Sequence, residues 1–408
     1  MEYCKDSNVL SPQLRLTQTV AANSDLPMFK ACVEEAKPAS VMCSLNSVNG
    51  VPSCANPLLQ NKLLRDRWGF TGFVVSDCGA IGFVQETHNF TATPKDTTAA
   101  ALLGGTDLEC GGPPAELTQY LPRILGKPTA VGTVQSSDID RTLRRVLTQV
   151  VRLGELDPAS TVSYKQLGPE VVDSPRGRAV ALRAAQESIV LLENRVVGGR
   201  KVLPLRPSAK VVFLGPHANS TQALLGDYHA YNPLIDSQSP LMCAVSSGLL
   251  TEADYAPGCD IDVPELSMND TAIAAAAAKA QSADVAVLFL GICGNRDLPG
   301  ATSVLPHLPA SSCGRFFEAE EADRESIEVP PVQRRLFDAV VAVQPATVVV
   351  LVNGGSLGGL ADIGKRSPGL IEAFCKSDCC VCLPSLADQD FFHRQTAGRW
   401  RGQRSRRC

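Results

Sequence analysis

One carboxylate ends a short apolar run at residues 72–77, which reads Gly-Phe-Val-Val-Ser-Asp. The run has the length and the content of valine and phenylalanine expected for a buried parallel strand, so Asp77 falls at the carboxyl end of that strand. In α/β barrels the residues that perform chemistry stand at this end of the strands. The competing interpretation is structural, with Asp77 capping a helix that starts near Gly79.

The composition limits the classes of protein to which the chain can belong. Its 408 residues are 44% hydrophobic and 20% charged, which is ordinary for a globular protein and sufficient for two domains. The formal net charge of -4 provides no broad basic field, so we expect no nucleic-acid partner, and a neutral, hydroxyl-rich substrate is compatible. The densest apolar runs have the length of core strands, so we expect no membrane partner.

Helical and extended patterns alternate around Asp77. We predict helices at 29–36, 57–68 and 97–103, and strands at 40–45, 72–77 and 106–108. This alternation is typical of parallel βα units. A longer helix is predicted at 137–153, with a capping box from Ser137 to Asp140. Its apolar residues recur at steps of three and four, so we expect this face to be buried: Ile139, Leu143, Val146, Val150 and Leu153.

A second region follows a Gly- and Pro-containing break and a linker at 157–177. We predict a helix at 178–187 and strands at 188–194, 210–215, 284–291 and 347–352. Strands that end in glycine turns suit a sheet whose loops face a ligand. No G-x-G-x-x-G sequence follows Val212 or Val350, which argues against a dinucleotide site.

The segments at 41–56 and 72–80 together resemble glycoside hydrolase family 3, and their cysteines and Asn-Gly-Val-Pro-Ser sequence resemble its β-xylosidase and arabinofuranosidase branch. The resemblance extends from about residue 26 to residue 374. It implies an α/β fold class, with a partial (β/α)8 barrel at 1–156, the linker at 157–177, and an α/β sandwich domain at 178–374. Only some three of the eight barrel strands are recognised. We expect an aperiodic, disordered tail at 375–408.

The resemblance also assigns roles to two carboxyl groups. The aspartate of the family's Ser-Asp motif is the nucleophile, which corresponds to Asp77. The acidic run 316–330 resembles the family's Glu-Ala-Glu-Gly-x-Asp-Arg loop, and Glu318 then corresponds to the acid/base, in preference to Glu320 and Glu321. Retaining glycosidases need two such groups about 5 to 5.5 Å apart. Without the resemblance, the acidic run indicates a solvated surface.

The implied reaction is retaining exo-hydrolysis of β-linked xylose from xylooligosaccharides or other β-glycosides, and of arabinofuranosides as a further option, without metal or organic cofactor. An alternative from another class is a catalytically incomplete protein with at most weak sugar binding. Leu45 stands where the family usually has a tyrosine beside the sugar, and Glu321 where it has glycine. Asp107 and Glu109 lie in a segment that matches the family's Gly-Thr-Asp-Leu-x-Cys motif, and we expect both residues to be structural. A turn role is as favoured as a cleft role for Asp227 and Tyr228.

Two other motifs offer competing chemistry. Gly354-Gly-Ser356-Leu-Gly358 has the form of a serine-hydrolase elbow, but the only later histidine is His393, in the tail. The tail also carries Cys375, Cys379, Cys380 and Cys382, whose spacing is a poor match to a zinc site, so we expect no metal.

The resemblance implies an extracellular location, although residues 1–6 lack the features of a secretory signal. Three sequons, at Asn89, Asn219 and Asn269, fit a secreted glycoprotein, although such triplets also arise by chance. The chain has 15 cysteines, an odd number that does not by itself fix the redox compartment.

Overall fold

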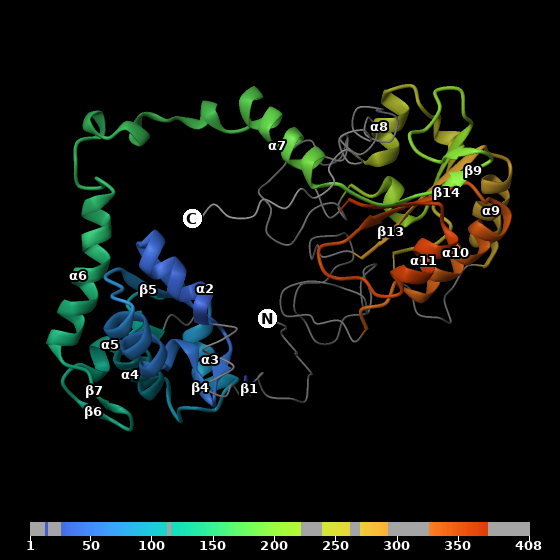
Figure 1. Cartoon of the computed structure of the whole chain (residues 1–408). Coiled ribbons are helices and arrows are strands. Elements are labelled where there is room, and N and C mark those ends of the chain that lie inside the picture. Colours follow the sequence, from blue (N-terminus) through green and yellow to red (C-terminus); the bar gives the residue numbers. More distant parts are fainter. Residues whose placement is uncertain are drawn as a thin grey trace. The chain divides into compact units, whose positions relative to one another are not determined.

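The chain forms two compact units, Met1–Pro169 and Glu170–Cys408 (Figure 1). The computed structural model describes residues 13–14, 26–111, 116–221, 239–261, 270–292 and 326–373. The division between the units falls inside the segment 157–177, which the sequence pattern predicts to be a linker.

Three neighbouring parallel segments form the centre of the first unit. Strand β2 (Ser40–Cys43) pairs in parallel with β5 (Phe73–Ser76), and Val75 of β5 forms a parallel bridge with Leu108. Parallel neighbours require crossover connections. The helical segment η4 (Leu58–Arg67) makes the first crossover, and helices α3 (Ala80–Glu86) and α4 (Pro94–Gly104) make the second. The predicted βα alternation is therefore confirmed for this part of the chain.

A hairpin follows β2 on the way to η4. Strands β3 (Ser47–Val48) and β4 (Val51–Pro52) pair antiparallel around Asn49 and Gly50, whose φ angles are 53° and 82°. A two-residue hairpin of type I′ requires positive φ at both central positions, and Asn-Gly adopts it at low cost. Strand β1 (Gln13–Leu14) pairs in parallel with β3. The 3-10 turn η3 (Ser53–Ala55) then leads into η4.

The core of the first unit lies between the parallel segments and the helices around them. It contains Leu45, Leu64, Phe70, Val74 and Ile81. Further elements complete the unit: α2 (Leu26–Ala31), η2 (Cys32–Ala36), α5 (Glu116–Ile124), β6 (Pro128–Thr129) and β7 (Gly132–Thr133).

Helix α6 (Ser136–Arg152) corrects two expectations. Its capping box joins Gln135 to Asp138, two residues earlier than the predicted pair Ser137 and Asp140. Its predicted apolar face is only partly buried: Ile139 packs against the core that contains Ile124, and Val146 and Val150 are half-buried, but Leu143 is 49% exposed and Leu153, at the C-cap, 57% exposed.

The buried positions of α6 are polar, Thr142 and Gln149. Thr142 faces the carboxylate of Asp107, so the helix is turned toward a buried charge. A buried charge without partners costs more free energy than exposed leucine does.

Three short 3-10 turns and a helix connect the units: η5 (Ala159–Thr161), η6 (Ser163–Gln166), η7 (Pro169–Val171) and α7 (Pro175–Ser188). Helix α7 begins three residues before its predicted start at 178. Its N-cap is Ser174, whose hydroxyl accepts from the amide of Gly177, and proline at the first helical position fits the same start.

The second unit is built on a six-stranded sheet with the order β12-β11-β13-β14-β15-β8. The first five strands are parallel, and β8 is antiparallel to β15. Their bounds are β12 (Tyr255–Ala256), β11 (Val211–Leu214), β13 (Val285–Gly291), β14 (Thr347–Val352), β15 (Gly369–Glu372) and β8 (Val190–Asn194). The predicted strands at 188–194, 210–215 and 284–291 are thus confirmed with shorter ends, and the strand at 347–352 is confirmed with the predicted bounds.

Alternating side chains of the central strands fill two separate cores. Phe213 and Phe289 lie in one core, 4.9 Å apart between ring centroids, with helix α8 (Pro240–Ser246). Leu214 and Leu288 lie in the other core, against helices α9 (Asp270–Gln281), α10 (Pro331–Val343) and α11 (Leu360–Arg366). Apolar residues at successive positions are typical of a parallel sheet covered on both faces. The unit is therefore an α/β sandwich.

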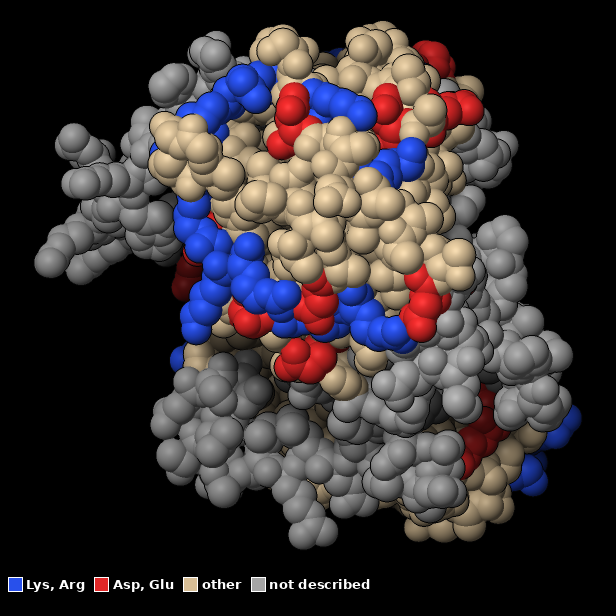
Figure 2. Space-filling view, turned by 90° about the vertical axis from the view of Figure 1, so that its right-hand side faces the viewer, with Lys and Arg blue, Asp and Glu red and all other residues tan. Residues whose placement is uncertain are grey.

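The surface of the second unit mixes both signs of charge. Arg334 pairs with Asp362, Arg335 with Asp270, and Arg366 with Asp338. Basic and acidic side chains also lie next to each other on the face shown in Figure 2. The smaller elements are β9 (Val196–Val197), β10 (Arg200–Lys201), η8 (Pro216–Asn219) and η11 (Glu252–Asp254). None of the helices in the described residues is long and apolar enough to cross a membrane.

Candidate active site

Asp77 directly follows β5, at the carboxyl end of the parallel segments. Its backbone N–H donates to the carbonyl of Cys43, at the end of the neighbouring strand β2, over 2.9 Å. One carboxylate oxygen, Oδ1, accepts from the N–H of Cys78 over 2.7 Å. The other oxygen has no hydrogen-bond partner among the described residues. The backbone carbonyl of Asp77 also accepts from the N–H of Ala80 over 3.1 Å, so the backbone is held on both sides, while one carboxylate oxygen is available for a ligand.

The capping interpretation of Asp77 is wrong. Helix α3 starts after Gly79, which occupies the N-cap in a left-handed conformation, and no side chain caps the helix. The carboxylate of Asp77 contacts the amide of the next residue instead of an amide of the helix.

Two disulfides lie next to Asp77. Cys43 is bonded to Cys54, and Cys78 is bonded to Cys110. The backbones of Cys43 and Cys78 both contact Asp77. The Cys78–Cys110 bridge joins the carboxyl-end loops of two neighbouring parallel segments, and the Cys43–Cys54 bridge closes the loop that follows β2, so covalent bonds restrain the part of the fold that carries the carboxylate.

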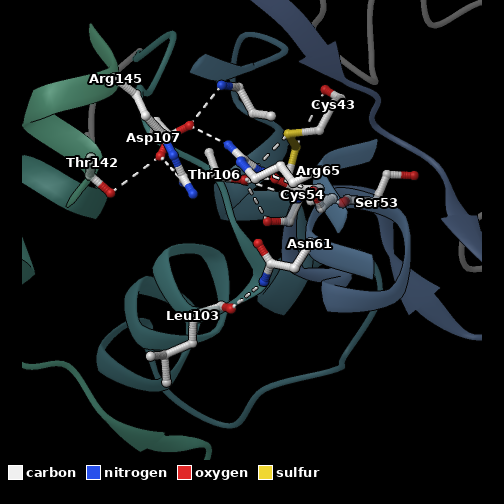
Figure 3. Close-up of polar contacts among 12 residues, drawn as sticks. Cys43, Ser53, Cys54, Asn61, Arg65, Leu103, Thr106, Asp107, Thr142 and Arg145 are labelled. Carbon is white, nitrogen blue, oxygen red and sulfur yellow. Dashed lines mark hydrogen bonds and ion pairs between the residues drawn. A yellow bond between two sulfur atoms is a disulfide. The ribbon is translucent and has the colours of Figure 1, made fainter. Parts of the chain in front are cut away.

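Asp107 is a buried structural carboxylate, as its motif predicts. Its side chain has no exposed surface, and Figure 3 shows it between Arg65 and Arg145. The Arg65 Nη2 lies 2.5 Å from Oδ2, and the Arg145 Nη1 lies 2.9 Å from Oδ1. The amide of Val74, in β5, donates to Oδ2 over 2.9 Å. One carboxylate thus joins η4, α6 and the strand that leads to Asp77.

Burial changes the pKa of Arg65, one of the two arginines that bind Asp107. Desolvation lowers the pKa of its guanidinium to about 10, although the neighbouring Asp107 opposes this shift. At neutral pH the guanidinium remains charged, so the pair is a buried ion pair. Such pairs are strongly destabilising when one partner is removed.

A second set of hydrogen bonds links η4, α4 and the segment after α4 to one another and to the loop that carries the Cys43–Cys54 bridge (Figure 3). The Thr106 hydroxyl donates to the carbonyl of Cys54 over 2.8 Å, and the Asn61 amide donates to the carbonyl of Leu103 over 3.1 Å. The Gln60 amide donates to the carbonyl of Ser53 over 2.8 Å. These contacts connect the loop after β2 to η4, which also binds Asp107 through Arg65.

Glu109 is also structural. Its carboxylate accepts from the amides of Glu116 and Leu117, at the start of α5, over 3.0 and 2.9 Å. A carboxylate is favoured at a helix N-terminus. Burial, together with a hydrogen bond to Glu109, raises the pKa of Glu116 to about 7, so the Glu116 carboxyl group is protonated below that pH.

Leu45, at the position where a tyrosine was expected from the resemblance, turns its side chain into the core, where it is 8% exposed. Its carbonyl accepts from Nε2–H of His88 over 2.8 Å. The side chain of Leu45 therefore packs in the core and helps to hold the loop that follows β2.

The acid/base assigned from the resemblance, Glu318, lies outside the described residues, as do Glu320, Glu321, Asp227 and Tyr228. The tail with Cys375, Cys379, Cys380, Cys382 and His393 lies outside them as well. Ser356, of the competing elbow motif, is exposed and has no histidine partner among the described residues.

The carboxyl edge of the second unit's sheet contains a buried histidine. His217 follows β11, is fully buried, and neither ring nitrogen has a hydrogen-bond partner of normal geometry in the described part of the chain. Burial lowers its pKa to about 4, and the nearby Ile292 backbone opposes this only in part. The ring is therefore neutral at physiological pH.

No cluster of three or more His, Cys, Asp or Glu side chains suited to a metal ion occurs in the described residues. Sequence reasoning missed Arg65 and Arg145, which bind Asp107, and both disulfides. Arg145 is on the predicted helix at 137–153, but nothing in its spacing singles it out. The crowding of Cys43, Cys54, Cys78 and Cys110 around the resemblance motifs was the available signal for the bridges.

Family models and relatives agree with this architecture. Residues 4–149 match the N-terminal domain of glycosyl hydrolase family 3, and residues 189–377 match its C-terminal domain. A probable exo-1,4-β-xylosidase of Aspergillus fumigatus is 34% identical over 335 residues, covering 81% of this chain and 38% of the relative. The β-xylosidase/α-L-arabinofuranosidase 1 of Medicago sativa subsp. varia is 31% identical over 335 residues, with the same two shares.

A solved structure of similar architecture is a family 3 exo-β-xylosidase in complex with a xylobiose aziridine activity-based probe. It has a TM-score of 0.76 and 28% identity, and the match covers 93% of this chain and 44% of that one. The chain thus spans 38% of the length of the curated relatives described above. The N-terminal domain match lies within the first unit, and the C-terminal domain match lies within the second. The chain therefore belongs to glycosyl hydrolase family 3.

Proposed function

We propose that the chain acts as a retaining β-glycosidase that removes β-linked xylose from the non-reducing end of xylooligosaccharides. The observation that carries the proposal is Asp77: a carboxylate at the carboxyl end of a parallel strand, fixed through its backbone, with one oxygen that has no hydrogen-bond partner among the described residues. The named relatives, which include xylosidases and a bifunctional arabinofuranosidase, support xylosides first and arabinofuranosides second.

In the proposed reaction Asp77 attacks the anomeric carbon as the leaving-group oxygen takes a proton from Glu318. A covalent glycosyl-enzyme forms, and the alcohol departs. Glu318, now a carboxylate, removes a proton from water, which attacks the same carbon and releases both the sugar and Asp77. The role of Glu318 rests on its resemblance to the family's acid/base loop alone.

The experiment is hydrolysis of an aryl β-D-xyloside by the purified 408-residue chain, with Asp77→Ala as the test variant. Asp66→Ala is the matched control, since Asp66 is an exposed aspartate of η4 in a surface pair with Lys62. We expect turnover in the wild type and the control, and none in Asp77→Ala. A trapped 2-fluoroxylosyl adduct should locate to the peptide that contains Asp77. Equal turnover in all three proteins, or an adduct elsewhere, would refute the assignment.

The alternative is a catalytically incomplete protein with weak sugar binding. The observation that favours it is the uncovered apolar face of α6, where Leu147 is 52% and Val151 58% exposed. Folded wild-type protein that binds xylobiose in calorimetry, forms no adduct and turns over no aryl xyloside would establish this alternative.

We also propose that the chain is extracellular and N-glycosylated at Asn89. Disulfides persist in oxidising compartments and are rare in the cytosol, and the first unit holds two. Asn89 is exposed, whereas the side chain of Asn219 accepts a hydrogen bond from the Ser239 hydroxyl over 2.8 Å. Asn269 lies outside the described residues.

The test is peptide-N-glycosidase treatment of the chain, secreted from a eukaryotic host behind a cleavable leader, with Asn89→Gln for comparison. Loss of a glycan-dependent mass in the variant is expected. An unmodified Asn89 peptide in the wild type would exclude this site.

A further inference from the structure

The loop that carries Asp77 is held to the next parallel segment at one residue, Cys110. The N–H of Cys110 donates to the hydroxyl of Ser76 over 2.9 Å, and the carbonyl of Cys110 accepts from Gly79 over 3.2 Å. Ser76 is 1% exposed, so the first of these bonds is shielded from water. Together with the Cys78–Cys110 disulfide, three links connect Cys110 to the residues on both sides of Asp77.

The bond that orients the carboxylate comes from the same bridge. Cys78 supplies the N–H that Asp77 Oδ1 accepts over 2.7 Å. Gly79 has φ of +80°, so the chain turns sharply directly after the bridged cysteine. Without the covalent link, the turn at residues 77–79 depends on single hydrogen bonds beside solvent, because Cys78 is exposed.

The two bridges differ in access. Cys43 and Cys54 are 7% and 1% exposed, whereas Cys78 is exposed and Cys110 partly exposed. Thiol–disulfide exchange needs a thiolate to reach a sulfur atom of the bridge. A dissolved dithiol therefore reaches Cys78–Cys110 first.

We propose that the Cys78–Cys110 disulfide is a positioning element for the Asp77 carboxylate, and that a dithiol reductant opens it selectively and lowers turnover. In this step a reductant thiolate attacks the bridge and forms a mixed disulfide, and its second thiol then closes the reductant's own S–S bond. The reductant loses two electrons and two protons, and Cys78 and Cys110 become two thiols. The effect on turnover rests on the proposed function, whereas the effect on the loop does not.

The experiment compares the wild-type chain with Cys78→Ser/Cys110→Ser, and uses Cys32→Ser as the matched control because Cys32 is exposed and unbridged. We expect kcat for the aryl β-D-xyloside to fall roughly 10- to 100-fold in the double variant. KM should change little, since the bridge acts on the nucleophile and not on a sugar contact. Cys32→Ser should match the wild type in both parameters.

Hydrogen exchange separates positioning from general stability. We expect faster exchange at the amides of residues 77–80 in the double variant, with unchanged exchange at Val74 and Leu108, whose amides donate to Asp107 and to Val74. Faster exchange throughout the first unit would show a purely structural bridge and overturn the proposal. Unchanged exchange at residues 77–80 would overturn the proposal, whatever the value of kcat in the double variant.

Differential alkylation under increasing dithiol tests the selectivity. Cys78 and Cys110 should become alkylated before Cys43 and Cys54, and the reverse order would overturn the reductive part of the proposal. If the wild type shows no turnover, the proposed function fails, and the exchange and alkylation results alone decide the positioning role.

Discussion

The Arg145 guanidinium lies 2.9 Å from the Asp107 carboxylate and thereby ties helix α6 to the segment that follows α4. Asp107 also receives the amide of Val74, so the same carboxylate supports strand β5, three residues before Asp77. The buried Asp107 carboxylate binds two arginines and the amide of Val74, and in this way it holds the strand that precedes the candidate active site.

Removing this charge should destabilise the first unit. We expect Asp107→Asn to lower the free energy of unfolding by about 3–5 kcal/mol, because two guanidinium groups lose their buried partner. Urea unfolding can be followed through Trp68 in a Trp400→Phe background, since these are the two tryptophans. The control Asp66→Asn removes an exposed pair and should cost less than about 0.5 kcal/mol. Equal effects of the two substitutions would contradict a stabilising role for the buried ion pairs of Asp107 with Arg65 and Arg145.

Glu116 should make the stability of the first unit fall as pH rises from 4.5 toward 7. The pKa of Glu116 is raised from 4.5 to about 7 in the folded state, so its contribution to stability is fully present below 4.5 and is lost as pH rises through 7. Glu116→Gln keeps a neutral side chain of similar shape and should remove this dependence. We expect the variant to lose less stability than the wild type between pH 5 and pH 8.

The same Trp68 unfolding measurement applies here, and Glu34→Gln, in an exposed pair with Lys30, is the matched control. Parallel curves for wild type and Glu116→Gln across this pH range would show that the pKa of Glu116 is not raised in the folded state.

His217 should make the second unit sensitive to acid. Its folded pKa is lowered from 6.5 to about 4, so its contribution is present above 6.5 and is lost as pH falls through 4. Phenylalanine at this position removes two buried nitrogens that have no partner in the described residues. We expect His217→Phe to unfold with a weaker dependence on pH between 6.5 and 4, and with stability at pH 7 equal to or above that of the wild type. A large loss of stability at pH 7 would show that the ring has an essential polar partner.

The exposed face of α6 should tolerate truncation. Leu147 is 52% exposed, so Leu147→Ala should cost less than about 0.5 kcal/mol. Ile124, in α5, is 1% exposed, and Ile124→Ala should cost about 2–5 kcal/mol. If Leu147→Ala costs as much as Ile124→Ala in the Trp68 measurement, the helix packs through the face that carries Leu147.

Much of the architecture was predictable because it depends on local periodicity. Short valine-rich runs bounded by glycine predicted β5, β11, β13 and β14, and the helical patterns between them required parallel pairing. The place of Asp77 at a strand end followed from the same boundary. Residue type and spacing along the chain contain this information without reference to distant segments.

Tertiary structure alone decided the contacts between distant residues. Arg65 and Arg145 lie 42 and 38 positions from Asp107, and the Cys78–Cys110 bridge spans 32 positions. With 15 cysteines the sequence allows many pairings, and helical spacing does not show which face meets a buried charge.

Helix α6 gives the physical reason most clearly. Its sequence predicts burial of leucines, but the buried Asp107 carboxylate would then lose two of its hydrogen-bond partners, so Thr142 and Arg145 face inward. The sequence by itself therefore determined the elements, their order and the place of Asp77, whereas only the packing of remote segments determined which side chains hold that aspartate in place.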